Sequence, residues 1–154
     1  MLNYLKIFFM SMVPIIELRG AVLYSQYLEL PIVTSYLVCI LGNMLPVPFI
    51  YFFARKILLW GRNKPVIGKA FEFIYQKGES AGQKLTEKAS RRGTFLALLL
   101  FVGIPLPGTG AWTGTLAASI LDMGIKHTAA AVMLGVLMAG IIMMTAGVLG
   151  FSLI

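Results

Sequence analysis

Three long stretches of this chain contain no charged residue, and their length constrains the fold more than any other feature. They run from Leu30 to Ala54, from Thr94 to Leu121 and from Thr128 to Ile154. Each exceeds the roughly 20 apolar residues that a helix needs to cross a bilayer. Backbone polar groups inside lipid must be satisfied within the segment, so such runs fold as helices. The sequence therefore predicts an all-α integral membrane protein.

The composition agrees with this fold class. Only 12% of the 154 residues are charged and 58% are hydrophobic, whereas soluble domains carry about 25% charged residues. The length suits one membrane domain over residues 1–154. Cys39 is the only cysteine, which excludes an intramolecular disulfide, and no metal-ligand cluster surrounds it. Because no nucleophile triad or pair of catalytic carboxylates is present, we expect no enzyme, no cofactor and no metal.

Positive charge is concentrated in one segment. Ten Lys/Arg and three Glu lie between Arg55 and Arg92, which accounts for the whole net charge of +7. In a chain this apolar, the positive-inside rule explains such a cluster better than nucleic-acid binding does. Apolar residues recur there at helical spacing from Ile67 to Ala89, and Gly93 marks the expected end. We predict a cytoplasmic amphipathic segment over residues 55–93, in contact with membrane lipids.

Two apolar segments are interrupted by residues that lipid disfavours. The first interruption reads Pro14-Ile-Ile-Glu17-Leu-Arg19-Gly20, and the second reads Pro105-Leu-Pro107-Gly108-Thr109-Gly110. Irregular backbone at membrane depth is tolerated only where protein or a water-filled cavity covers it. We therefore predict two re-entrant hairpins, at 5–29 and 94–122, in preference to straight kinked helices. Spanning helices at 30–54 and 128–150 would follow them.

The two halves have the same order of segments, and a shift of 94 positions aligns Gly20 with Gly114. With the middle of the chain in the cytoplasm, the first hairpin enters from outside and the second from inside. The prediction is an inverted repeat of a re-entrant hairpin plus a spanning helix. Paired interrupted segments of this kind indicate the binding site of a transporter.

The interruptions supply the candidate site. Thr109 is a possible helix cap, and the helix end after Gly110 would attract an anion. Arg19 adds a positive charge. Glu17 in an apolar cavity would bind a proton more readily than in water and could couple transport to protons, although Arg19 opposes this effect. The predicted substrate-binding residues are Glu17, Arg19, Pro107, Gly108, Thr109, Gly110, Trp112 and Thr113.

Structural explanations of the same residues stay open. The spacing Gly110-x-x-x-Gly114 also allows close helix packing. Glu17 and Arg19 could form an ion pair that only stabilises the fold, although residues two apart do not face each other on a helix. Trp112 could belong to the core and not to a cavity. Asp122, Lys126 and His127 are read as a cytoplasmic boundary.

The motif Glu17-Leu-Arg19-Gly20-Ala21, combined with Pro105-x-Pro107-Gly108-Thr109-Gly110-x-Trp112-Thr113-Gly114, resembles the putative small multidrug export protein family. That family is similar to the DedA or VTT-domain superfamily. The resemblance implies re-entrant hairpins, a homodimer and lipid-phosphate transport, with Glu17 as the acidic and Arg19 as the basic residue. Proteins of the DedA type carry charges in both hairpins, whereas this chain has none from Thr94 to Leu121.

These observations predict a multi-pass cell-membrane transporter or flippase for an amphiphilic anion, such as a polyprenyl or phospholipid phosphate. We expect membrane lipids and a second copy of the chain as partners, and no nucleic acid. A small multidrug exporter and a non-transporting membrane scaffold or assembly factor are the alternatives.

Overall fold

The structure is a computed structural model that describes residues 1–65, 68–86 and 91–151. Every regular element in these ranges is helical. The elements are α1 (Leu2–Met12), α2 (Glu17–Tyr27), α3 (Ile32–Met44), α4 (Pro46–Phe49), the π-helix η1 (Ile50–Ala54), α5 (Arg55–Arg62), α6 (Gly68–Thr86), α7 (Arg91–Gly103), α8 (Ala111–Ile120) and α9 (Ile125–Phe151).

Two helices in the described part of the chain are long and apolar enough to cross a membrane. One is continuous through α3, α4 and η1, over Ile32–Phe53, and the other is α9, over Ile125–Gly150. They overlap the uncharged runs at 30–54 and 128–150. Together with the composition, they indicate a membrane protein.

The first of these helices changes its geometry but stays helical. Pro46 and Pro48 have no N–H to donate, and a π-helical turn follows them at Ile50–Ala54. Helices adjust in this way where prolines remove regular hydrogen bonds. This π-helical turn also contacts α8, because the Ser119 hydroxyl donates to the Tyr51 carbonyl at 2.6 Å. The Tyr51 hydroxyl accepts from the Gly124 N–H at 3.0 Å.

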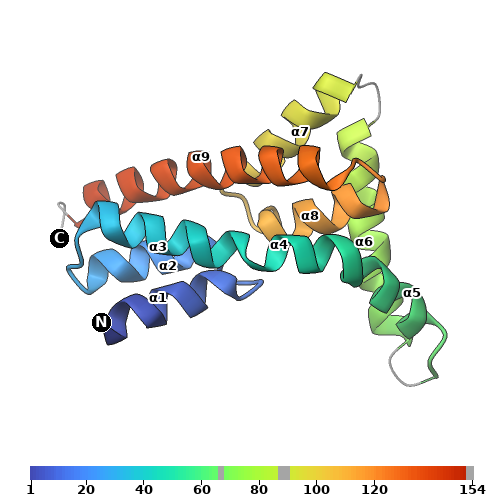
Figure 1. Cartoon of the computed structure of the whole chain (residues 1–154), viewed down its shortest axis with the longest axis horizontal. Coiled ribbons are helices and arrows are strands. Elements are labelled where there is room, and N and C mark those ends of the chain that lie inside the picture. The colour runs from blue at the N-terminus through green and yellow to red at the C-terminus, as the bar shows by residue number, and fades with distance from the viewer. Residues whose placement is uncertain (66–67, 87–90, 152–154) are drawn as a thin grey trace.

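Two broken segments flank these long helices (Figure 1). α1 and α2 pack against each other and against α3, and α7 packs mainly on α9. In Figure 1 the α1–α2 pair opens toward the end that holds both termini, while α7 and α8 open toward the opposite end. Their connecting turns meet in the middle of the molecule.

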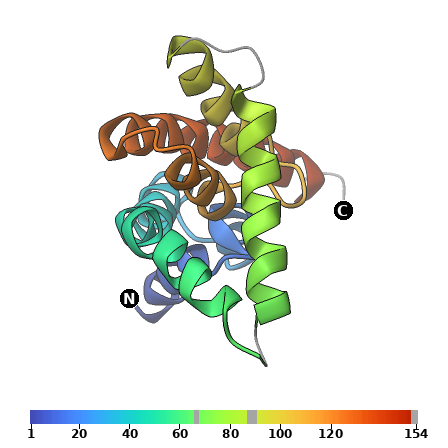
Figure 2. The same ribbon diagram turned by 90° about the vertical axis from the view of Figure 1, so that its right-hand side faces the viewer.

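α6 lies across the end of the molecule opposite the termini, transverse to α3 and α9 (Figure 2). It contacts α5 and α8, and Phe71 of α6 comes close to Gly61 of α5. Gly93, the expected end of the basic segment, lies inside α7, which begins at Arg91. Ile67 and Ala89, the ends of the predicted apolar stripe, lie outside the described residues.

The turns after α2 and α8 share one backbone geometry. Leu28 and Leu121 end the two helices with φ/ψ of −84°/6° and −83°/1°. Glu29 and Asp122 follow with φ of 53° and 50°. Four backbone hydrogen bonds of the first turn recur 93 positions later in the second. In the first turn, the N–H groups of Leu28, Glu29, Leu30 and Ser35 donate to the carbonyls of Tyr24, Gln26, Ser25 and Pro31. In the second turn, the N–H groups of Leu121, Asp122, Met123 and Thr128 donate to the carbonyls of Ala117, Ser119, Ala118 and Gly124.

Candidate functional site

The two chain breaks lie against each other. Residues 13–16 connect α1 to α2, and residues 104–110 connect α7 to α8. The Trp112 indole N–H donates to the carbonyl of Met12 at 3.0 Å. This bond joins the start of α8 to the end of α1. The segments that the sequence singled out therefore form one site, although about 90 residues separate them.

Glu17 binds the N-terminus of α8. Its Oε1 accepts the backbone N–H of Trp112 at 3.1 Å, and the residue is only 7% exposed. A carboxylate is stabilised there because free N–H groups and the helix dipole make a helix N-terminus positive. Glu17 itself has φ of 50°, a conformation that costs a non-glycine residue energy and occurs where surrounding contacts enforce it.

Gly110 makes room for this carboxylate. It is the N-cap of α8, with φ of 152°. A Cβ on Gly110 would collide with the Glu17 carboxylate. Only glycine combines this backbone conformation with so close an approach.

Arg19 binds the opposite helix end, at the C-terminus of α7. Its Nη1 donates to the Leu106 carbonyl at 2.7 Å. Its Nη2 lies 3.0 Å from the Thr109 hydroxyl, 3.2 Å from the Val102 carbonyl and 3.3 Å from the Ile104 carbonyl. A cation is favourable there because the last carbonyls of a helix have no partner within the helix.

Glu17 and Arg19, at the start of α2, thus each stabilise one of the two helix ends that flank the second break. Glu17 and Arg19 make no ion pair with each other within the described residues. Their positions two apart in the sequence explain this, since such residues do not face each other on a helix. The helix ends that the sequence left open for a ligand are occupied by the chain's own side chains.

Thr109 does not cap α8, contrary to the sequence-based interpretation. Its hydroxyl lies 2.9 Å from the carbonyls of Ile104 and Leu106 and accepts from Arg19. Thr109 therefore stabilises the α7–α8 connection through hydrogen bonds within that connection. Pro107 and Gly108 are exposed in the turn next to it, with Gly108 at φ of 81°, and they do not reach Glu17 or Arg19 through any hydrogen bond of a described residue.

An apolar cavity of about 390 Å³ adjoins the site. Trp112 and Thr113 from the start of α8 line it, so both predicted residues face a cavity next to the Glu17 bond. The remaining lining comes from the first break, from η1 and α5, from α6 and from α8: Pro14, Ile50, Ile57, Phe71, Ile74 and Leu116.

Sequence reasoning missed several contributors to this site. The carbonyls of Met12, Val102 and Leu106 are backbone atoms, which no residue type reveals. Phe71 and Ile74 belong to the expected apolar stripe of α6, but that stripe alone does not show what it covers. Among the described residues, no group of three metal-ligating side chains occurs.

Comparison with known families adds one match. The family described as "Putative small multi-drug export protein" matches residues 17–142. The chain belongs to this family. No curated protein and no solved structure matches it.

The matched region contains both charged residues of the site, Glu17 and Arg19, and the helix ends that they contact. It begins at Glu17 and ends within α9, so it covers Arg19, the α7–α8 connection and all of α8. The family assignment and the apolar helices together support a membrane protein of the export type. The family description refers to drug export and gives no mechanism or site residue.

Proposed function

We propose that this chain is a small membrane transporter of amphiphilic molecules with an anionic head group. One observation carries the proposal: a buried carboxylate occupies a helix N-terminus directly beside an apolar cavity. Glu17 thereby takes the position that a substrate carboxylate or phosphate would take. The apolar part of the substrate would lie against Trp112 and Leu116.

In this scheme the substrate competes with the Glu17 carboxylate for the N-terminus of α8. A substrate head group displaces Glu17 from the backbone N–H groups of α8, and Arg19 supplies the nearest positive charge. Release of Glu17 and Arg19 frees the two breaks from each other, which lets the site open to either side in turn. A protonated Glu17 leaves the helix end more easily, so the proposal includes Glu17 as the proton-coupling group.

The proposal includes two re-entrant hairpins. Their support is the position of each break relative to the middle of the long helix beside it. A Cβ on Gly42, near the middle of Ile32–Phe53, would collide with the Phe8 carbonyl of α1. A Cβ on Gly135, near the middle of α9, would come within 2.8 Å of the Leu99 carbonyl of α7. α1 and α7 thus pass the middle of the long helices just before each chain breaks.

An inverted repeat is part of the same proposal. Its support is the turn geometry that recurs 93 positions later and the matching use of Gly42 and Gly135. Repeats of opposite orientation around a central site are a common construction of transporters. The cytoplasmic location of residues 55–93, the multi-pass topology, the homodimer, the absence of enzymatic activity and the relation to DedA proteins stay predictions.

The test is transport by the purified chain in liposomes, with a lipid-phosphate flip assay and a drug-efflux assay run in parallel. Thr113→Phe places a ring in the cavity without removing a charge, whereas Thr145→Phe makes the same change at an exposed site on α9. We expect at least tenfold slower flipping with Thr113→Phe and normal flipping with Thr145→Phe. No flipping by the unaltered chain, or equal rates for both variants, would overturn the proposal.

Glu17→Gln tests the proton step in the same liposomes. We expect flipping by this variant to lose its response to an imposed pH gradient. An unchanged response would exclude Glu17 as the proton-coupling group.

Export of small amphiphilic drugs is a second candidate, favoured by the description of the family and by the aromatic residues Phe71 and Trp112 of the cavity. It predicts efflux without lipid flipping. A scaffold without transport is a third candidate, favoured by the four acceptors that Arg19 already meets within the chain. It predicts that Glu17→Gln and Arg19→Ala lower stability while neither assay gives a signal.

A further inference from the structure

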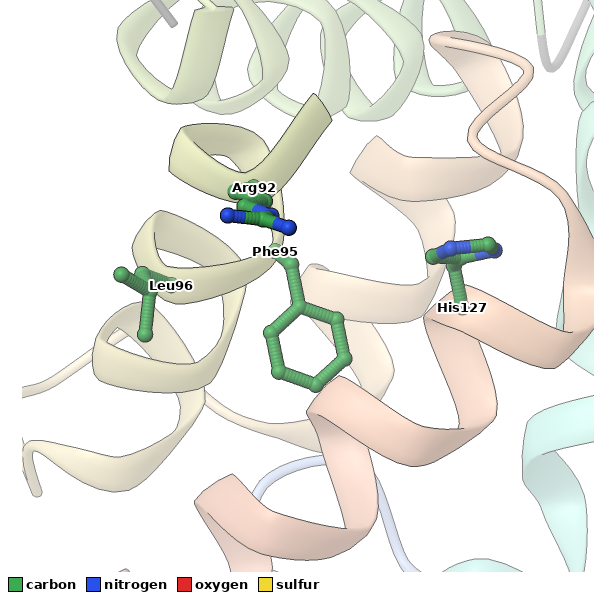
Figure 3. Close-up of a pocket in the computed structure, with 4 residues that line it drawn as sticks. All are labelled: Arg92, Phe95, Leu96 and His127. Atoms are coloured by element: carbon green, nitrogen blue, oxygen red, sulfur yellow. The ribbon is translucent and has the colours of Figure 1, made fainter. Parts of the chain in front are cut away.

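A second cavity lies apart from the charged site, between the start of α7 and the start of α9. Its volume is about 610 Å³, and Arg92, Phe95, Leu96 and His127 line it. Figure 3 shows Arg92 and His127 on facing helices, with the ring of Phe95 between them and Leu96 alongside. None of these residues takes part in the Glu17 and Arg19 contacts.

The lining combines two kinds of surface. Phe95 and Leu96 supply an apolar wall, and Leu96 is 56% exposed. Arg92 and His127 are exposed polar groups at the same cavity. A ligand that fits must carry an apolar chain and a polar group that accepts hydrogen bonds from a guanidinium.

The charge of the surroundings selects the sign of that polar group. Besides Arg92 in the cavity wall, Lys126 is exposed directly before His127. Against these cations, the turn before α9 carries one carboxylate, Asp122. The mouth of the cavity is therefore positive and suits an anion.

The location of the cavity at the starts of two apolar helices indicates which kind of anion it would bind. Arg92 and His127 lie in the first turns of α7 and α9, and both helices continue as apolar segments. Lipid head groups occupy this level of a membrane protein, and basic pockets between membrane helices bind them. A volume of about 610 Å³ is within the range of roughly 300–1,000 Å³ for small-molecule pockets.

We infer that this cavity binds one anionic phospholipid, with its phosphate on Arg92 and an acyl chain along Phe95 and Leu96. The ligand is a membrane phospholipid, because a free phosphate ester would leave the apolar wall unused. The site is independent of the transport site proposed above, and its test does not require transport.

The experiment is native mass spectrometry of the full chain, titrated with phosphatidylglycerol or phosphatidylcholine. We expect the unaltered chain to retain one phosphatidylglycerol in preference to phosphatidylcholine. Arg92→Gln should weaken this binding roughly tenfold, as expected for loss of one charge-assisted contact. Lys69→Gln removes the same charge from α6 outside this cavity and should leave binding unchanged.

A second pair of variants tests the apolar wall. Leu96→Trp should fill the cavity and weaken retention of phosphatidylglycerol, whereas Leu100→Trp, one turn further along α7, should not. Excess glycerol 3-phosphate should not displace the lipid. The inference is wrong if Arg92→Gln binds like the unaltered chain, if phosphatidylcholine binds equally well, if Leu96→Trp has no effect, or if glycerol 3-phosphate competes.

Discussion

Glu17 and Arg19 show how two charges can be stable in an apolar protein without pairing to each other. Each meets the partial charge of a helix end: Glu17 accepts the Trp112 N–H at the start of α8, and Arg19 donates to the Val102 carbonyl at the end of α7. Charged groups at membrane depth are costly unless such partners satisfy them. The same contacts fix how the two breaks are placed, so the charges contribute to structure in every functional scheme considered.

Arg19→Lys should destabilise the protein although it keeps the charge. The planar guanidinium reaches four acceptors from two nitrogens, whereas an ammonium group is a compact donor on a flexible stem. Of these acceptors, the Val102 carbonyl belongs to a buried residue, and a buried carbonyl left without a donor costs about 1–3 kcal/mol. We expect a clearly lower melting temperature of the detergent-solubilised chain.

The matched control for this prediction is Arg92→Lys, because Arg92 is exposed. Surface substitutions of this kind change stability by roughly 0.5 kcal/mol or less. Equal melting temperatures of the two variants would show that the contacts of Arg19 with the α7–α8 connection add little stability.

At the scale of elements, glycines set the distances between helices. α7 packs closely on α9 at Gly135, where an added Cβ would lie 2.7 Å from the Val102 Cβ and 2.8 Å from the Leu99 carbonyl. Both atoms are close to or part of the backbone, so a side-chain rotation cannot relieve the overlap. Small residues serve this purpose in membrane helices because they let backbones approach.

Gly135→Ala should therefore lower stability, although alanine is the better helix former. The gain in helix propensity is roughly 0.5–1 kcal/mol, and overpacking costs about 1–3 kcal/mol. Gly150→Ala is the control on the same helix, since nothing lies within 4 Å of its added Cβ. We expect thermal unfolding at lower temperature for Gly135→Ala and no loss for Gly150→Ala; a stabilised Gly135→Ala protein would contradict the packing described.

For the whole molecule, the sequence predicted the segments better than their contacts. Two of the three uncharged runs located the long helices, and Pro14 and Pro107 located the breaks, because these signals are local. The bond from Trp112 to Met12 and the contacts of Arg19 could not be predicted, since they join backbone atoms about 90 residues apart. Thr109 was misread as a helix cap because the sequence does not show that Arg19 engages its hydroxyl.

The proposed orientation of the halves leads to a prediction about membrane sidedness. The turn between α2 and α3 lies at the end of the molecule with the termini, and the start of α9 lies at the opposite end (Figure 1). Glu29 and Lys126 are exposed in these two places, and Cys39, the only natural cysteine, is buried. In a Cys39→Ala background, Glu29→Cys and Lys126→Cys should react with a membrane-impermeant maleimide from opposite sides.

Lys69→Cys on α6 should react from the same side as Lys126→Cys, because α6 crosses that end of the molecule (Figure 2). The Cys39→Ala parent should not react and serves as the control. Opposite sidedness requires that the long helices cross the bilayer while each break turns back within it. Labelling of Glu29→Cys and Lys126→Cys from one side would mean that the path between them crosses the bilayer an even number of times, and the inverted arrangement of hairpins would then be wrong.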